Sequence, residues 1–145
     1  MSLDFNRDEF RVLIKKTNNI KHMKILVVDD EKDIQPLFLQ RFRREIKSGE
    51  VIFEFAYSGE EALDCMKKYL HEAVLILSDI NMPGMSGLEL LERIKNKNHT
   101  PPPVVMMITA YGDAENHKRA MELGADDFLT KPVDFTALRE KIKTM

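Results

Sequence analysis

Five polar residues lie at or just beyond the ends of short apolar runs, where predicted strands would finish. They are Asp29, Asp30, Asp79, Thr109 and Lys131. Three carboxylates that meet in one crevice would repel one another, and the pKa of at least one of them would rise. A hard divalent cation relieves this repulsion, and an open crevice with few oxygen ligands suits Mg²⁺, which keeps several waters and commonly binds beside a phosphate. We therefore expect a Mg²⁺ site.

The same residues could carry phosphoryl chemistry. An aspartate beside a bound metal can attack a phosphoryl group, a lysine ammonium can hold one phosphoryl oxygen, and a threonine hydroxyl can donate to another. Taken singly, each has an ordinary explanation: the acidic pair could cap a helix, Thr109 could be a strand-end hydroxyl and Lys131 a surface charge. The conjunction favours chemistry, because such groups at the same edge of four strands are hard to produce by chance.

Short apolar runs alternate with longer stretches of helical spacing, a pattern typical of repeated β-α-β units. The runs are "KILVV" (24–28), "VIFEFA" (51–56), "AVLIL" (73–77), "VVMMI" (104–108) and "DFLT" (127–130). They lack apolar/polar alternation, so each strand should be buried on both faces of a parallel sheet with helices on each side. We predict an α/β fold with a doubly wound, five-stranded parallel sheet, in which polar groups at the carboxyl ends of the strands line a crevice.

The intervening stretches place apolar residues three and four apart, which gives each predicted helix one face for the sheet. These stretches are 34–46, 62–70 and 88–94. Pro36 is tolerable only in a first helical turn, and Gly124 can end a fourth helix. Ser58 and Glu61 have the spacing of a capping box.

The composition excludes several classes of protein. The chain has 145 residues, 43% of them apolar, with 22 basic and 24 acidic side chains, so we expect one domain and no net field that attracts nucleic acid or a membrane. A single cysteine, Cys65, excludes an internal disulfide and fits a reducing compartment. No apolar run is long enough to span a bilayer, and charges replace the apolar stretch of a signal peptide. We expect a cytoplasmic protein.

Residues 1–22 precede the predicted α/β domain, which we place at 23–145. They contain a weak helical stripe followed by a basic stretch without acidic residues. We interpret them as an N-terminal extension or linker. A nucleic-acid-binding arm is the alternative, but the charge cluster is small for that role.

Four motifs together resemble the receiver domain of two-component response regulators. They are "LVVDDE" (26–31), "LSDINMPGMSGLELL" (77–91), "MITAYGD" (107–113) and "GADDFLTKP" (124–132). The resemblance covers about residues 24–143 and implies a flavodoxin-like fold with strand order 2-1-3-4-5. It also implies a regulatory domain that takes a phosphoryl group from the phosphohistidine of a histidine kinase in a Mg²⁺-dependent reaction. Such a domain catalyses only its own phosphorylation and dephosphorylation, and it controls an output domain or partner.

The resemblance assigns roles to individual residues. Asp79 would be the phosphoacceptor, and Asp29 and Asp30 would be the acidic pair that holds the metal with it. Asn81 would offer its backbone carbonyl as another metal ligand, and Lys131 would contact the phosphoryl group.

A conformational switch is implied as well. Thr109 matches the family's switch hydroxyl and Phe128 its switch aromatic, although plain core packing is an alternative for Phe128. A phosphate on Asp79 adds acceptor oxygens, so Thr109 would pull its loop inward and vacate space that an aromatic ring can fill. Pro132 matches a position that follows a cis peptide in the family, and the bulky Tyr111 could slow hydrolysis of the acyl phosphate.

Two partner surfaces follow from the resemblance. The donor, a histidine kinase or phosphotransfer protein, would dock near the first helix, where Gln35, Leu37 and Phe38 are candidates, although only some of them can avoid the core. The readout surface would comprise the helix that ends near Gly124 and the strand and helix that follow it. The resemblance allows a phosphorylation-dependent dimer, and we expect no membrane and no direct nucleic-acid contact.

Two other functions stay open. One is a haloacid-dehalogenase-type phosphatase, which also uses an aspartate after a strand but needs a second carboxylate two residues on, where this chain has Asn81. The other is a receiver-fold adaptor that binds partners without phosphorylation. The chain ends just as its last predicted helix would finish, which indicates either a stand-alone receiver or a fragment of a larger protein.

Overall fold

Five parallel strands form one sheet in a computed structural model that describes residues 23–68, 74–97 and 102–145. They are β1 (Met23–Val28), β2 (Val51–Ala56), β3 (Val74–Asp79), β4 (Val104–Thr109) and β5 (Asp127–Thr130). Their order across the sheet is β2-β1-β3-β4-β5, and every neighbouring pair is parallel. The predicted sheet and its strand order are confirmed. Predictions for residues 1–22, Leu70 and Ala73 lie outside the described residues.

Two strands extend beyond their apolar runs. Asp79 pairs with Ile108, and Thr109 pairs with Thr130, so Asp79 and Thr109 are the last residues of β3 and β4 rather than the first residues after them. The difference arises because main-chain pairing in a parallel ladder does not depend on whether the side chain is apolar. Both side chains are therefore held by the sheet itself rather than by a loop.

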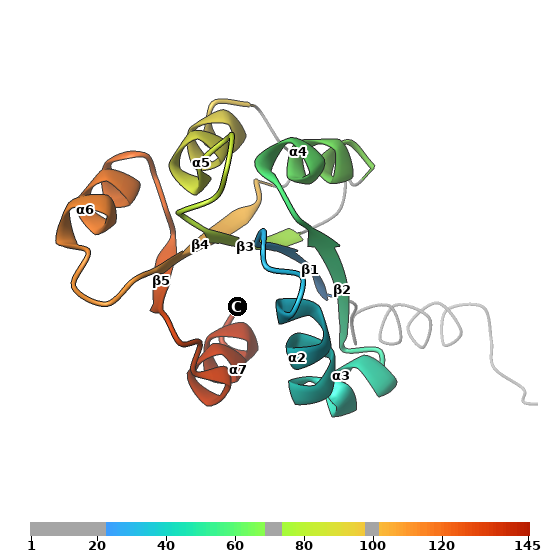
Figure 1. The fold of residues 1–145 in the computed structure, drawn as a ribbon. Helices are drawn as coiled ribbons and strands as arrows, with labels where there is room; N and C mark the ends of the chain where they lie inside the picture. The colour runs from blue at the N-terminus through green and yellow to red at the C-terminus, as the bar shows by residue number, and fades with distance from the viewer. Residues whose placement is uncertain (1–22, 69–73, 98–101) are drawn as a thin grey trace, which may run out of the picture.

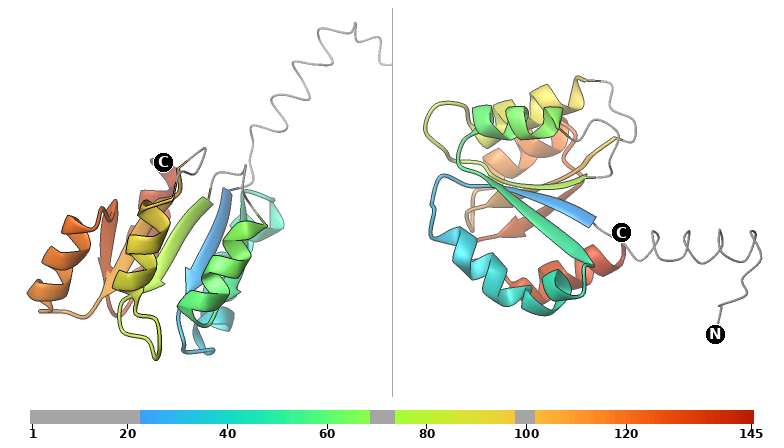
Figure 2. Two further views of the ribbon diagram at one scale, coloured as in Figure 1. Left: turned by 90° about the horizontal axis from the view of Figure 1, so that it is seen from above. Right: turned by 90° about the vertical axis from the view of Figure 1, so that its right-hand side faces the viewer.

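Helices cover both faces of the sheet, as Figures 1 and 2 show. One layer consists of α4 (Gly59–Lys67), α5 (Gly87–Lys95) and α6 (Ala114–Glu122), and the other of α2 (Ile34–Arg41), α3 (Arg43–Lys47) and α7 (Phe135–Lys143). Successive strand residues point into opposite layers, so Ile76 packs under α4 and α5 while Leu75 and Leu77 pack with the other core. The doubly wound arrangement that the sequence predicts is confirmed.

The first predicted helix is interrupted. The apolar spacing of residues 34–46 predicts one helix, but Phe42, with φ −107° and ψ 23°, separates α2 from α3. Its ring stays buried and lies close to the rings of Phe38 and Phe53. The spacing of apolar residues gives no sign of this break. Phe42 packs in an aromatic cluster to which both strands and helices contribute, and such tertiary contacts are not visible in local spacing.

The predicted helix signals lie where the sequence places them. Pro36 is in the first turn of α2, and the Ser58 hydroxyl accepts a hydrogen bond from the Glu61 N–H at 3.1 Å. The Glu61 carboxylate accepts from Tyr57 N–H at 2.6 Å, one residue earlier than in a standard capping box. Gly124, with φ 96°, follows α6 in the left-handed conformation that favours glycine.

Helix α7 contacts α3 and the end of α2 through Arg139. Arg139 forms an ion pair with Glu45 at 2.6 Å, donates to the carbonyl of Arg41, and lies 5.0 Å from the centre of the Phe42 ring. Partial burial alone would raise the pKa of Glu45, but the hydrogen bond and charge of Arg139, a backbone hydrogen bond and the charge of Lys143 together outweigh it and lower that pKa. None of the helices in the described ranges has the length and apolar character that crossing a bilayer requires.

Candidate functional site

Three aspartates meet at the carboxyl edge of the sheet. Oxygen atoms of Asp29, Asp30 and Asp79 all lie within 4.8 Å of one another. The register pairs Val28 with Ser78, so the residues that follow them, Asp29 and Asp79, emerge side by side from adjacent strands. Asp29 is 2% exposed and Asp79 5% exposed, whereas Asp30 faces solvent. The structure thus brings together the three carboxylates that the sequence singles out.

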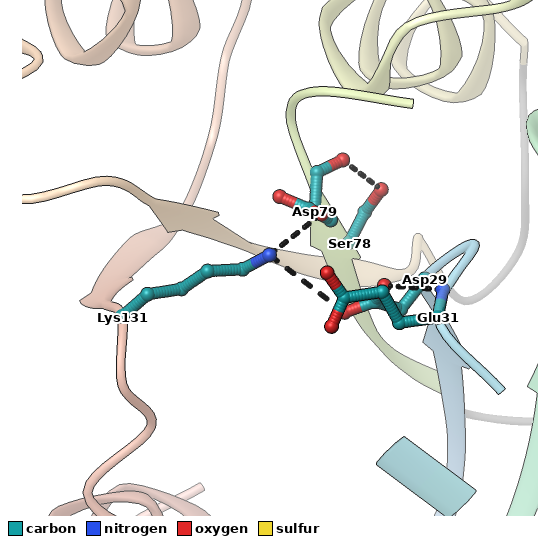
Figure 3. Close-up of polar contacts among 5 residues, drawn as sticks. All are labelled: Asp29, Glu31, Ser78, Asp79 and Lys131. Atoms are coloured by element: carbon teal, nitrogen blue, oxygen red, sulfur yellow. Dashed lines mark hydrogen bonds and ion pairs between the residues drawn. The ribbon is translucent and has the colours of Figure 1, made fainter. Parts of the chain in front are cut away.

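Asp29 is held by its own loop. Its Oδ1 accepts a hydrogen bond from the Glu31 N–H at 2.9 Å, as Figure 3 shows. Burial raises the pKa of Asp29 and the charge of Asp79 raises it further, although the Glu31 hydrogen bond and Lys131 act in the opposite direction. The buried negative charge is therefore only partly compensated by the protein.

The aspartate cluster fits a hard divalent cation. All three groups offer carboxylate oxygens, two of them on neighbouring rigid strands and one open to water. Such a cation would offset the repulsion that raises the pKa of Asp29. Asn81, two residues beyond the end of β3, lies in the loop next to this cluster, and its side chain is exposed.

Lys131 completes the charged centre. Its Nζ lies 2.8 Å from Oδ2 of Asp79 and 3.9 Å from Oδ2 of Asp29, as drawn in Figure 3. Partial burial would lower the pKa of Lys131, but the hydrogen bond and charge of Asp79, together with the charges of Asp29 and Glu31, outweigh it and the net pKa is raised. The Lys131 N–H also donates to the Thr109 carbonyl at 2.9 Å, which fixes the residue to the end of β4. The Lys131–Pro132 peptide is cis.

Thr109 and Phe128 have other partners than the carboxylates in this conformation. The buried Thr109 hydroxyl donates to the Leu129 carbonyl at 3.4 Å. Phe128 is half-buried against the layer of α4, α5 and α6, and its ring is 3.8 Å from that of His117, centre to centre. Sequence reasoning missed His117, because the pair joins a helix and a strand through tertiary packing. Tyr111 is 90% exposed and contacts little.

The candidate docking residues of the first helix separate into different environments. Phe38 is fully buried in the aromatic cluster, so the idea that it contacts a partner is wrong. Gln35 is half-buried and accepts a hydrogen bond from the Tyr57 hydroxyl. Leu37 is 39% exposed, and so is Leu39, which the sequence did not single out. The exposed apolar surface of α2 therefore comes from these two leucines.

Two further residues contact the main chain of Asp79. The hydroxyl of Ser78, which is 1% exposed, donates to the Asp79 carbonyl at 3.0 Å. Gly87, the first residue of α5, packs so closely on the same carbonyl that any Cβ at this position would overlap it. The available signal for Ser78 was a polar residue between the apolar run 73–77 and Asp79, whereas the contact of Gly87 depends on how the loop between β3 and α5 folds back.

Comparisons with known proteins agree with this geometry. Residues 25–143 match the response regulator receiver domain family. The chain is 31% identical over 123 residues to response regulator RppA of Synechocystis sp.. The aligned region is 85% of this chain and 50% of RppA. The chain spans half or less of the length of RppA and of two longer curated relatives.

Two solved structures are similar throughout the sheet and its helices. A response regulator receiver domain protein from Clostridium thermocellum has a TM-score of 0.72 at 30% identity, with 84% of this chain and 92% of that chain covered. The other is a co-crystal structure of the Saccharomyces cerevisiae histidine phosphotransfer signaling protein Ypd1 with the receiver domain of its downstream response regulator Ssk1. It has a TM-score of 0.71 at 26% identity, with 84% and 87% covered.

Proposed function

Because the chain belongs to the response regulator receiver domain family, we propose that Asp79 accepts a phosphoryl group from the phosphohistidine of a histidine kinase or phosphotransfer protein. The observation that carries the proposal is the position of Asp79, a buried carboxylate flanked by two other aspartates and by the ammonium of Lys131 at 2.8 Å. The carboxylate that would act as nucleophile, the aspartates that would bind a metal ion and the Lys131 ammonium that would bind a phosphoryl oxygen all lie at the carboxyl edge of the sheet.

The transfer requires an in-line displacement at phosphorus. A carboxylate oxygen of Asp79 forms a P–O bond while the P–N bond of the donor breaks, and the imidazole nitrogen leaves with the electron pair and is then protonated. Lys131 already lies beside Asp79, so its ammonium can pair with a phosphoryl oxygen as the acyl phosphate forms. The rigid ends of β3 and β5 hold these two groups in place.

The aspartate cluster would hold Mg²⁺ through Asp29, Asp30 and Asp79, with the backbone carbonyl of Asn81 as a further ligand. Bound there, the ion would neutralise negative charge shared by the carboxylates and the phosphoryl oxygens. Asp29 keeps its orientation through the Glu31 N–H, so the chain contributes a pre-positioned ligand.

Phosphorylation would then change the conformation of β5, the outer strand on the β4 side of the sheet. The Thr109 hydroxyl would leave the Leu129 carbonyl for a phosphoryl oxygen, and Phe128 would leave His117 and turn into the vacated space. Phe128 belongs to β5, which lies between α6 and α7, so this movement would alter the face that α6, β5 and α7 form. We assign readout by an output domain, a downstream protein or a second copy of the chain to that face.

The domain would act in the cytoplasm as a regulatory module, with catalysis limited to its own phosphorylation and dephosphorylation, and without direct contact to nucleic acid or membrane. The complex of Ypd1 with the receiver domain of Ssk1 supports a phosphotransfer protein as one kind of partner. A phosphatase of the haloacid-dehalogenase type is less well supported, because the position two residues after Asp79 is Asn81 rather than an acid. Residues 1–22 remain assigned to an extension or linker.

Intact mass after incubation with Mg²⁺ and acetyl phosphate or phosphoramidate tests the proposal. We expect one phosphoryl adduct in the parent protein and none in Asp79→Asn. Asp64→Asn is the matched control, since its exposed carboxylate pairs with Lys67 at the surface of α4. An adduct that persists in Asp79→Asn contradicts the assignment, and no adduct in the parent favours the adaptor function. Turnover of an unrelated phosphoester favours the phosphatase.

A further inference from the structure

Helix α5 begins in direct contact with the main chain of Asp79. A Cβ added to Gly87 would lie 2.0 Å from the Asp79 carbonyl oxygen and 2.8 Å from both its carbonyl carbon and the Ile80 Cα. These are main-chain atoms at the end of a central strand and of the residue that follows it, and they cannot rotate away. The backbone of Gly87 is helical, so the close approach to Asp79 and not an unusual φ excludes a side chain.

The peptide between Asp79 and Ile80 is also restrained by hydrogen bonds from the helix side and from the strand side. The Gly87 N–H donates to the Ile80 carbonyl at 2.8 Å and closes the loop between β3 and α5. Ser86 caps the helix by accepting from the Glu89 N–H at 3.2 Å. On the strand side, the Ser78 hydroxyl donates to the Asp79 carbonyl at 3.0 Å, as Figure 3 shows. The first turn of α5 and the end of β3 therefore form one rigid unit.

We propose that Ser78 and Gly87 are positioning residues for Asp79, an inference that rests on the proposed phosphoacceptor role. Together they fix the peptide between Asp79 and Ile80, and that peptide sets the direction in which the Asp79 carboxylate leaves the strand. A misplacement of about 1 Å at a reacting group can cost on the order of a hundred-fold in rate. The peptide also leads into Asn81, so it orients both the nucleophile and the adjoining loop.

The chain contains a matched control in α4. Gly59 is also a buried first helical residue, and it also follows a serine cap whose side chain accepts from a glutamate N–H. A Cβ on Gly59 would instead meet the side chain of Met85, with Sδ at 2.6 Å, Cγ at 2.9 Å and Cβ at 3.0 Å, and the outer atoms of that side chain can move aside. The two Gly→Ala changes therefore match in helix position, cap and burial, and differ in whether they push on Asp79.

The test compares Gly87→Ala, Gly59→Ala and the parent protein. Phosphorylation by acetyl phosphate is measured over a range of Mg²⁺ concentrations, so that the apparent Mg²⁺ affinity and the rate at saturating Mg²⁺ are separated, and thermal unfolding is recorded for each chain. We expect Gly87→Ala to lose about ten- to a hundred-fold in the saturated rate relative to Gly59→Ala. Equal rates in two folded variants overturn the proposal.

Ser78 provides a second arm that does not add volume. Ser78→Ala should slow the saturated rate about three- to ten-fold, and Ser78→Thr, which keeps a hydroxyl, should recover it. If Gly87→Ala does not fold, Ser78→Ala decides, and a parental rate overturns the proposal. Mg²⁺ dissociation constants from NMR titration read the Asp79 carboxylate without phosphorylation. A parent protein that binds Mg²⁺ but takes no phosphoryl group contradicts the proposed function. In that case the positioning role is judged from Mg²⁺ binding alone, and dissociation constants in Gly87→Ala and Ser78→Ala equal to that of the parent overturn it.

Discussion

The ammonium of Lys131 lies 2.8 Å from Oδ2 of Asp79, which joins the end of β5 to the end of β3 across the carboxyl edge of the sheet. The same ammonium is 3.9 Å from Oδ2 of Asp29. Before any phosphoryl group arrives, this one side chain supplies the positive charge nearest to the two buried carboxylates. Its contribution to phosphoryl transfer can be separated from its contribution to the folded protein.

Lys131→Met should slow phosphorylation of Asp79 by acetyl phosphate about a hundred-fold, because a pre-positioned charge that stabilises the phosphoryl oxygens is lost. Mg²⁺ affinity should not fall, since the variant removes a cation that lies beside a carboxylate of the metal cluster. Mass spectrometry gives the rate and NMR titration the affinity. Lys141→Met, which breaks the half-buried pair with Asp127 away from the carboxylates, is the control. A parental rate in Lys131→Met would exclude the phosphoryl-binding role.

Asp29→Asn should make the protein more stable in Mg²⁺-free buffer, by roughly 0.5–2 kcal/mol. The reason is that burial and the charge of Asp79 raise the pKa of Asp29, while an amide oxygen can still accept from the Glu31 N–H. Added Mg²⁺ should raise the melting temperature of the parent and not that of the variant. Asp33→Asn, which changes an exposed acid in the same loop, controls for net charge. Lower stability of Asp29→Asn would refute this account.

Glu45→Gln should lower the free energy of unfolding at pH 7 by about 1–2 kcal/mol, because it breaks the charged hydrogen bond to Arg139. Folding lowers the pKa of Glu45, so the unfolded state takes up the proton first as the pH falls. The stabilisation is complete above the unfolded pKa, about 4.3, and is lost at lower pH as the folded carboxylate protonates. Denaturant titrations at several pH values should show the difference from the parent shrinking below about pH 4. Glu140→Gln, which replaces an exposed acid one position after Arg139 in α7, is the control for net charge.

The sequence was sufficient for the fold and for most of the charged centre. Continuous apolar runs without alternation indicate strands buried on both faces, and parallel strands bring residues such as Asp29 and Asp79 to one edge. These features depend on the periodicity of apolar residues and on the parallel direction of the strands, both of which can be read from a single sequence. The arrangement of the carboxylates and Lys131 followed from that topology.

Other features depend on contacts that the sequence does not encode locally. Phe42 continues the helical spacing, yet α2 ends there while its ring packs with Phe38 and Phe53. Gly87 is an acceptable first helical residue in any helix, and its meaning comes from the main chain of Asp79 folded against it. Such contacts are decided by tertiary packing at the scale of single atoms.

Tyr111→Ala should shorten the lifetime of the acyl phosphate by a few-fold if the tyrosine ring limits access of water to Asp79. The ring is 90% exposed in this conformation, so the variant should change the free energy of unfolding by less than about 0.5 kcal/mol. The phosphoprotein is separated from the donor, and its decay is followed by intact mass. Tyr57→Phe, which removes a hydroxyl from another loop beside α2, is the control. An unchanged lifetime in Tyr111→Ala would remove the shielding hypothesis.

Activation at Asp79 should separate the rings of Phe128 and His117, whose centres are now 3.8 Å apart. Aromatic rings in close contact shift each other's proton resonances, so beryllofluoride with Mg²⁺, an acyl-phosphate mimic, should move the His117 imidazole signals toward their positions in Phe128→Leu. The chain has four histidines, and His117→Gln identifies the signal to follow. Asp79→Asn should show no movement. Unchanged His117 signals in a fully modified parent would mean that Phe128 is a core residue and not a switch.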